Sequence, residues 1–496
     1  MTTLRTSIAA GLIGLCALIL ISGCTDDFSA INEDPVEPTF VSEEPLMTRA
    51  LRKAMLDDFT WQVGEHLHAN MFVQHFANPI PGFNTDRYEV NNAWLERYWQ
   101  IAYTDFGKDI QQVIDQTSDD PQKVNKLAQA RIWKAFIVLR LTDFFGDIPY
   151  SEAFQGLTTP AYDRQEDIYL DLFNELDEAV RQFDASQEDR FGSADVLFQD
   201  DLEAWKRFAN SLRLRLAMRV SEVDEARASQ EAQAAANADG GLISSNSEAA
   251  KLEPDGSSRT ESNPLATVMS FQDSRVSATM ESYLRDFNDP RLETYIAPAV
   301  GSDFDQRRGY PNGLSASQIQ EIDAADSTSI AGSVFQDSSN PISVMSHAEV
   351  RFLQAEAAMR GFIGGDAATF YEEGIRSTME RYDIPDDEVD AYLAEPGVAW
   401  DPAVSDEEKL EQIIRQKWLA LFGRSGFEAW AEYRRTGYPE LQEIGAPGGG
   451  TTNGIVPRRV PYPEDEDFVN TENKEEAVSR LDEGDTYLSR MWWDVN

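Results

Sequence analysis

The stretch LEAWKRFANSLRLRLAMRV, residues 202–220, shows most directly how this chain folds. Its large apolar residues recur at spacings of three and four: Leu202, Trp205, Phe208, Leu212, Leu216 and Val220. Since an α-helix turns once in about 3.6 residues, these side chains share one face and the charged residues lie on the other. The spacing predicts an amphipathic helix that packs on a core.

The same spacing extends outward from this stretch in both directions. It predicts further helices over residues 42–76, 93–116, 121–145, 165–183, 347–360, 367–382 and 406–433. No alternation typical of strands covers a comparable length. The helices follow one another in pairs with modest connections, as in helix-hairpin repeats. We therefore expect an all-α fold on a tetratricopeptide-like helix-pair scaffold.

Two stretches interrupt the helical pattern. Residues 240–341 are rich in Ser, Asn, Asp, Gly and Pro, and they predict a long, irregular, loop-rich insertion. Aromatic residues persist throughout this insertion, which favours an ordered structure. Residues 437–466 form a second irregular region, with three consecutive glycines at 448–450 as its tip.

The N-terminus predicts where the protein works. Arg5 precedes an apolar run over residues 8–21, which is typical of a secretory signal and too short to span a bilayer. Ile21-Ser22-Gly23-Cys24 resembles the lipobox of bacterial lipoproteins, in which the cysteine becomes the acylated first residue. We expect a signal peptide over 1–23, lipidation at Cys24, a polar tether over 24–41 and a single domain over 42–496. Acyl chains would hold the protein on a membrane without embedding it.

The net charge is -44, from 87 acidic and 43 basic residues. Long-range repulsion makes nucleic acid and anionic lipid surfaces poor partners for such a chain. The acidic residues are spread along the whole sequence, which favours adaptation to high salt over a localised cation-binding surface. The only cysteine besides Cys24 is Cys16, which leaves with the signal, so the mature chain has no disulfide and no thiolate metal site.

The sequence carries no motif for catalysis. It lacks a nucleophile elbow, a phosphate loop, a dinucleotide fingerprint and a calcium loop with full ligand spacing. His66 and His68 would point about 200° apart on a helix, which disfavours a shared metal ion. With 87 acidic residues, pairs of carboxylates are no evidence for a glycoside hydrolase. We expect no catalytic residue, no metal and no cofactor.

Binding of carbohydrate or peptide needs flat apolar faces and polar groups on exposed loops. Residues 78–92 and 304–313 have this mixture. The candidate ligand-binding residues are Phe83, Asn84, Arg87, Tyr88, Phe304, Arg307, Tyr310 and Asn312. Each ring has an alternative role, which is to pin its loop onto the scaffold. Trp94 and Trp99 open the next predicted helix, and we expect them to be packed.

Several motifs follow one another along the chain: DFSAINEDP at 27–35, LTDFFGDIPY at 141–150, DPR at 289–291, AEAAMRG at 355–361, the segment 416–437, RRVPYP at 458–463 and the segment 484–494. Together they resemble the SusD/RagB family of outer-membrane nutrient-binding lipoproteins, near its SusD-like branch. Most of these motif residues are expected to be structural. We expect Trp418, Trp430, Trp492 and Trp493 in the core, and Arg434 and Arg435 tying helix ends to carboxylates.

The resemblance implies a function as well as a fold. It implies that loops and insertions on one side of the helices form the binding face, and that the protein is not an enzyme. It implies two partners, an oligomeric nutrient such as a glycan and a SusC-like TonB-dependent transporter that takes up this nutrient through the outer membrane. A lipid-anchored glycoside hydrolase, or a helical-repeat scaffold that binds only protein, are the alternatives.

Overall fold

The computed structural model describes residues 41–89, 91–299, 306–322, 327–445 and 452–496. Contacts divide the chain into a unit Met1–Ser42 and a unit Glu43–Asn496. The predicted signal peptide, Cys24 and all but the last residue of the tether lie outside the described residues. Among the helices that are described, none combines the length and the apolar character that crossing a bilayer requires.

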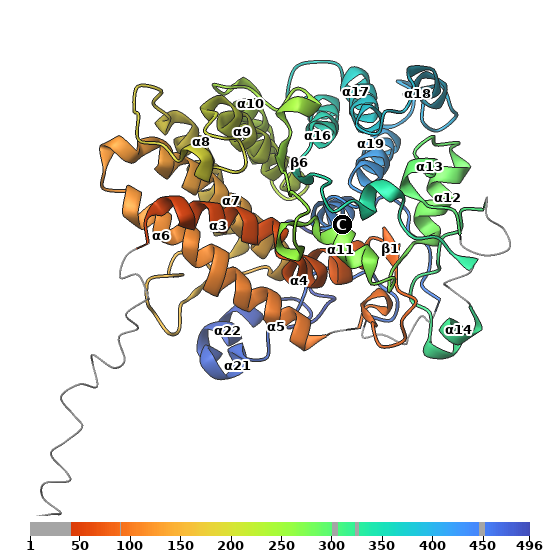
Figure 1. Ribbon diagram of the computed structural model, residues 1–496, viewed down its shortest axis with the longest axis horizontal. Helices are drawn as coiled ribbons and strands as arrows, with labels where there is room; N and C mark the ends of the chain where they lie inside the picture. The colour runs from red at the N-terminus through yellow and green to blue at the C-terminus, as the bar shows by residue number, and fades with distance from the viewer. Residues whose placement is uncertain (1–40, 90, 300–305, 323–326, 446–451) are drawn as a thin grey trace, which may run out of the picture. The chain divides into compact units, whose positions relative to one another are not determined.

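The second unit is built from helices, so the all-α prediction is confirmed (Figure 1). The helices of its first half are α3 (Glu43–Leu56), α4 (Asp58–Trp61), α5 (Asn92–Ile101), α6 (Gly107–Thr117), α7 (Val124–Phe145), α8 (Gln165–Gln182), α9 (Leu202–Arg219) and α10 (Glu225–Asn237). Those of its second half are α11 (Pro264–Ser270), α12 (Ala278–Asp286), α13 (Leu292–Tyr295), α14 (Ala316–Glu321), α16 (His347–Met359), α17 (Ala367–Glu380), α18 (Asp386–Leu393), α19 (Asp406–Ala420), α20 (Gly426–Thr436), α21 (Glu466–Val469) and α22 (Thr471–Val478). Two π-helical segments, η1 (Gln62–Asn70) and η3 (Ala102–Phe106), join the early helices. Short 3₁₀ segments are η2 (Thr85–Arg87), η4 (Pro121–Lys123), η5 (Gly192–Ala194), η6 (Asn246–Glu248), η7 (Arg259–Glu261) and η8 (Ser333–Gln336).

Helices that are neighbours in sequence pack against each other, as the helix-pair prediction requires. α7 packs on α8, α9 on α10 and α16 on α17 (Figure 1). The apolar helix faces predicted from the sequence are buried. On α8 these buried residues are Ile168, Leu172, Leu176 and Ala179. Burial of such stripes is the main favourable contribution to the stability of the scaffold.

Three predicted helices are interrupted. The helix expected over 42–76 is divided into α3, α4 and η1, and the one expected over 93–116 is interrupted by η3. The helix expected over 406–433 is divided into α19 and α20. Gly423 between them has φ +65°, a conformation that ends a helix, and the Ser425 side chain then caps α20 by accepting from the N–H of Glu428 at 3.3 Å.

Strands are short and form three antiparallel pairs among the described residues. β1 (Phe76–Ala77) pairs with β5 (Arg275–Val276), β2 (Ile148–Pro149) with β3 (Tyr162–Asp163), and β4 (Ala250–Leu252) with β6 (Ile342–Met345). The predicted insertion over 240–341 contributes β4, β5 and four short helices, α11 to α14. Its rings Tyr295 and Phe335 are buried, which explains how a sequence so rich in polar residues holds a defined structure.

Motifs that are far apart in sequence meet at the C-terminal end of α7. Gly146 caps this helix with φ +90°, which a residue with a side chain rarely adopts. The guanidinium of Arg459 donates to the carbonyl of Phe145 at 3.0 and 3.1 Å, and the indole of Trp493 donates to the Asp143 carboxylate at 3.1 Å. The motif segments therefore hold the C-terminal part of the chain against α7.

Large side chains of the last third form much of the core. Trp418, Trp430 and Trp493 are buried as predicted, whereas Trp492 is half-buried and tilts against Tyr169. Trp94 and Trp99 are both predicted to be packed. Trp99 is buried, and Trp94 is half-buried.

The arginine pair on α20 behaves differently from the prediction at one of its two positions. Arg435 is fully buried and donates to both carboxylate oxygens of Glu356 at 2.7 Å and to Glu432 at 2.7 Å. Arg434 was also expected to bind carboxylates. It instead donates to the backbone carbonyls of Asp143 and Arg458 and lies over the Trp430 ring.

Candidate functional site

The two loop segments singled out in the sequence lie against each other. The Asp86 carboxylate accepts from the backbone N–H of Asn78 at 3.0 Å and from that of Gly313 at 3.3 Å. Asp86 is buried, and this burial raises its pKa to about 6, although the two N–H donors favour the charged form. Gly313 has φ +69°, and a Cβ there would lie 2.5 Å from Ile444. A glycine is therefore required where the loops meet.

A third segment, residues 438–445, completes this surface. The Gln74 side chain donates to the carbonyl of Gln442 at 2.7 Å, and the N–H of Gly445 donates to the carbonyl of Asn312 at 2.9 Å. We call residues 78–89, 306–322 and 438–445 the loop face. Its segments come from separate parts of the sequence, so the face exists only in the folded chain.

Three of the predicted binding residues support the loop face from within. Tyr88 and Tyr310 have no exposed area, and Asn312 is 5 % exposed. Tyr310 packs with Ala77 and Leu314, and the Asn312 amide donates to the carbonyl of Phe76 at 2.8 Å. In this conformation these side chains are closed to a ligand. The sequence does not reveal that these residues are buried, because it does not show that the loops enclose a small apolar interior of their own.

Phe83, Asn84 and Arg87 are partly exposed on the loop face. The Phe83 ring meets the Trp94 ring edge to face, with centroids 5.6 Å apart and an interplanar angle of 81°. Asn84 and Arg87 both donate to the carboxylate of Glu89, Arg87 at 3.1 Å. A partly exposed ring, Phe83, therefore lies in the same short segment as an amide and a guanidinium that a shared carboxylate orients, and the Trp94 ring of α5 packs against it.

The two remaining predicted residues do not join this group. Phe304 lies outside the described residues. Arg307 is partly exposed, donates to the carbonyl of Ile296 at 2.8 Å, and accepts at its own carbonyl from Arg285 at 2.8 Å. These contacts place Arg307 beside α12 and the end of α13.

A hollow of about 380 Å³ adjoins the loop face between α12 and residues 440–443. Tyr283 and Phe287 line it with parallel rings whose centroids are 6.2 Å apart, and the Tyr283 hydroxyl donates to the carbonyl of Glu440 at 2.9 Å. Both rings are half-buried. Tyr283 is on α12 and Phe287 directly follows this helix, one turn later, so the spacing of four in the sequence was the signal that could have indicated them.

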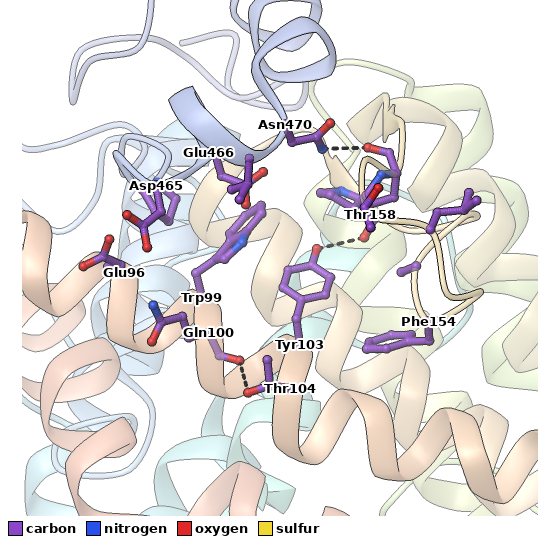
Figure 2. A pocket seen from close by; sticks show the side chains of 16 residues that line it. Glu96, Trp99, Gln100, Tyr103, Thr104, Phe154, Thr158, Asp465, Glu466 and Asn470 are labelled. Carbon is purple, nitrogen blue, oxygen red and sulfur yellow. Dashed lines mark hydrogen bonds between the residues drawn. The ribbon is translucent and has the colours of Figure 1, made fainter. Parts of the chain in front are cut away.

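A second cavity, of about 330 Å³, lies beside α5 (Figure 2). Its walls come from α5 and η3, from the chain after β2 and from α21. The aromatic residues are Trp99, Tyr103 and Phe154, and the Tyr103 hydroxyl donates to the carbonyl of Pro149 at 2.8 Å. Phe154 has φ +66°, a conformation that costs a bulky residue about 1–2 kcal/mol. We call this cavity the α5 pocket.

The α5 pocket is acidic. Its lining includes Glu96, Asp465 and Glu466 and contains no Lys or Arg. Partial desolvation together with the neighbouring Asp465 and Glu464 raises the pKa of Glu96. Sequence analysis missed this pocket. Glu96, Trp99, Gln100 and Tyr103 are spaced as one helix face, and such a face is usually read as core.

His66 and His68 are core residues. Both rings are buried in η1, where burial lowers their pKa values to about 3 and about 4. His66 shares a hydrogen bond with the Ser274 hydroxyl at 3.0 Å, and His68 binds the carbonyl of Val63. Within the described part of the chain, no three His, Cys, Asp or Glu side chains gather closely enough to hold a metal ion.

Known proteins share both sequence and fold with this chain. A family model described as SusD-like, starch-binding and associating with the outer membrane matches residues 35–463. A solved chitin-binding SusD homolog from Flavobacterium johnsoniae is 31% identical, with 91% of this chain and 98% of that chain covered and a TM-score of 0.81. A SusD homolog from Bacteroides uniformis is also 31% identical, with 92% and 99% covered and a TM-score of 0.81. One from Parabacteroides distasonis is 25% identical, with 92% and 98% covered and a TM-score of 0.83. No curated protein matches the chain.

Proposed function

The chain belongs to the SusD-like family of starch-binding proteins that associate with the outer membrane, and we propose that it captures an oligomeric glycan at the cell surface without cleaving it. In this proposal the protein passes the glycan to a SusC-like TonB-dependent transporter. Binding without chemistry needs a shaped surface with few fixed polar groups, and it needs no nucleophile or metal.

The half-exposed ring pair Phe83–Trp94 is the observation that carries this proposal. A pyranose ring has an apolar face that packs on an aromatic ring, while its hydroxyl groups need hydrogen-bond partners. Asn84 and Arg87 offer such partners in the same segment, and Glu89 holds both in place. Held side chains lose less conformational freedom when a ligand binds.

A chitin-type glycan is the ligand class that we propose. Two of the similar solved proteins, 30% and 31% identical, are named as chitin-binding. The acetamido group of N-acetylglucosamine offers a carbonyl oxygen that a guanidinium such as Arg87 can bind, and a methyl group that can pack on a ring. Starch oligosaccharides lack this group and serve as the comparison ligand.

Attachment to the outer membrane is proposed to occur through acyl chains on Cys24. Two or more chains hold a protein on a bilayer stably, with about 0.8 kcal/mol for each buried CH₂ group. Cys24 is followed by a polar segment with Pro35 and Pro38, which suits a tether that lets the binding domain reach a transporter.

Calorimetric titration with N-acetylglucosamine oligosaccharides and with glucose oligosaccharides tests the capture of a glycan. We expect binding of the first, and about tenfold weaker binding by Phe83→Ala and by Trp94→Ala, which is about 1.4 kcal/mol. Phe271→Ala is the matched control, because Phe271 is exposed but lies outside the loop face. Full affinity in the folded Phe83→Ala and Trp94→Ala variants would reject the site.

Two further measurements separate the alternatives. Shorter sugars appearing during incubation of pure protein with oligosaccharide would support a glycoside hydrolase and reject non-catalytic capture. Absence of any glycan binding would favour a scaffold that binds only protein. For delivery, extraction in mild detergent followed by affinity purification should recover a TonB-dependent barrel, and recovery without one would reject that step alone.

A further inference from the structure

The α5 pocket lies on the opposite side of α5 from the loop face. Residues three and four apart share one face of an α-helix. Glu96, Trp99 and Gln100 of α5 have this spacing, and Tyr103 follows in η3. Trp94, which meets Phe83, is two residues before Glu96 and therefore points to the other side. The pocket is thus a second concave surface, separated from the ring pair of the loop face by one helix.

Aromatic rings form much of the pocket wall. The Trp99 and Tyr103 ring centroids are 4.9 Å apart, and those of Tyr103 and Phe154 are 5.9 Å apart. Figure 2 shows Trp99 and Tyr103 in the middle of the pocket, with Phe154 at one end and the carboxylates of Glu96 and Asp465 at the other. Since the faces of aromatic rings are electronegative, such a wall attracts a cation as well as an apolar surface.

The charge of the lining has one sign. Glu96, Asp465 and Glu466 contribute carboxylates, and no lysine or arginine lines the pocket. Glu466 accepts from the Tyr162 hydroxyl at 2.7 Å, and the adjacent Glu464 accepts from the Asn92 amide. These partners are neutral, so they do not offset the charges of Glu466 and Glu464. A ligand with a positive charge would relieve the repulsion among these acids.

We propose that the α5 pocket binds a sugar unit that carries a protonated primary amine, such as a glucosamine unit of partly deacetylated chitin. The pyranose ring would pack on Tyr103, the partly exposed ring in the middle of the pocket, and the ammonium group would lie between Glu96 and Asp465. This inference rests on the proposed function, because the amine-bearing units belong to the same glycan whose capture we propose. Loss of an acetyl group turns the neutral acetamide of N-acetylglucosamine into an amine that is protonated at mildly acidic pH.

The rim of the pocket favours a sugar over a lysine side chain of a protein. Gln100 and Thr158 are exposed at the rim and offer an amide and a hydroxyl to sugar hydroxyl groups. A lysine side chain would use the acids alone and would make no use of these two groups. A volume of about 330 Å³ is within the range of small-ligand pockets, about 300–1,000 Å³.

The experiment compares two disaccharides, one of glucosamine and one of N-acetylglucosamine, on the full mature protein. Both are followed by calorimetry and by the fluorescence of tryptophan. We expect at least tenfold tighter binding of the glucosamine disaccharide. The double variant Glu96→Gln with Asp465→Asn should abolish this preference and leave the affinity for long N-acetylglucosamine oligosaccharides unchanged. Phe83→Ala should weaken the binding of long N-acetylglucosamine oligosaccharides and keep the preference for the glucosamine disaccharide.

A matched control separates the pocket from the overall charge of the chain. Asp387→Asn with Glu388→Gln removes the same charge from exposed positions on α18 and should keep the preference. The inference is wrong if this control loses the preference for the glucosamine disaccharide as completely as the pocket variant does. It is also wrong if the pocket variant keeps that preference. A trilysine peptide that displaces the glucosamine disaccharide equally well would also overturn it. Unchanged binding of neutral oligosaccharides would in each case leave the proposed function standing.

Discussion

The carboxylate of Asp86 accepts a hydrogen bond from the backbone N–H of Gly313 at 3.3 Å, across 227 positions of sequence. The same carboxylate accepts from Asn78 at 3.0 Å, so one buried acid joins both loops of the loop face. The helices that the structure describes in these two loops are short, η2 of three residues and α14 of six. The face therefore depends on a small number of specific hydrogen bonds, and its stability depends on the charge of Asp86.

This dependence predicts an effect of pH. The ordinary pKa of an Asp is 3.8, and burial raises that of Asp86 to about 6 in the folded protein. Between these values the folded state holds a proton that the unfolded state has released, so the contribution of Asp86 to stability falls as the pH rises. Asp86→Asn does not titrate. We expect the stability of the wild type relative to this variant to fall by about 2 kcal/mol between about pH 4 and about pH 7.

Urea unfolding of both proteins at a series of pH values measures this difference. Arg87 lowers and Glu89 raises the pKa of Asp86, and both are retained in the variant, so they cancel in the comparison. Asp387→Asn, at an exposed position on α18, should show no such trend. A difference between wild type and Asp86→Asn that stays constant with pH would show that folding does not raise the pKa of Asp86.

Tyr310 distinguishes a supporting role from a ligand contact. Its ring is fully buried, and its hydroxyl has no hydrogen-bond partner among the described residues. Removing such a hydroxyl costs nothing, so Tyr310→Phe should keep or raise the free energy of unfolding, by up to about 1 kcal/mol. Tyr310→Ala removes the buried ring and should lower it by about 3–5 kcal/mol. Chemical denaturation measures both. Weaker glycan binding by a fully stable Tyr310→Phe would instead place this hydroxyl on the ligand.

The helices of the scaffold could be predicted from the sequence because each has its own apolar stripe. The predicted ranges 165–183 and 202–220 differ from α8 and α9 by a single residue at their C-terminal ends. The interruptions at η1 and η3 could not be predicted, because the apolar spacing continues through them and only the tertiary contacts select the π-helical hydrogen bonds.

The candidate site was predictable only in part. Composition indicated the two loops, and Asp86 brings them together. The composition of the loops could not distinguish Phe83, which is partly exposed, from Tyr88, which is buried, because both are aromatic residues in one polar loop. The α5 pocket was missed for a different reason. Its walls come from segments around residues 99, 154 and 466, and no local pattern shows that they meet.

Arg435 predicts how far the scaffold depends on buried charge. It is fully buried and its two terminal nitrogens donate to Glu356 and Glu432 at 2.7 Å. Removing one partner of a buried ion pair leaves the others without compensation, which typically costs about 3–5 kcal/mol. We expect this loss for Arg435→Met in urea unfolding. Arg435→Lys should restore little, because an ammonium cannot form the two parallel hydrogen bonds.

An exposed arginine provides the control for this measurement. Arg285 pairs with Glu281 one turn earlier on α12 and is half-exposed, so Arg285→Ala should cost less than about 1 kcal/mol. Stability of Arg435→Met equal to that of Arg285→Ala would mean that the network around Glu356 does not support the fold.

The lipobox predicts the location of the protein. Cys24→Ser removes the only thiol of the mature chain and with it the proposed site of acylation. Most of the protein should then move from the membrane fraction to the soluble fraction after cell fractionation, because no other anchor is proposed. Cys16→Ser is the control, since Cys16 lies in the predicted signal and its loss should leave the fraction unchanged. Retention of the Cys24→Ser protein on the membrane would reject the lipid anchor.

The net charge of -44 predicts that salt stabilises the fold. Repulsion among the acidic residues acts over the Debye length, which falls from about 10 Å at 0.1 M salt to about 3 Å at 1 M. The compact state brings the charges closer than the unfolded chain does, so screening favours folding. We expect the thermal midpoint to rise between these concentrations by similar amounts in NaCl and KCl, because screening depends on ionic strength. A rise that requires only a low concentration of one divalent cation would instead indicate a specific cation site, and no rise would mean that the charges are too dispersed to matter.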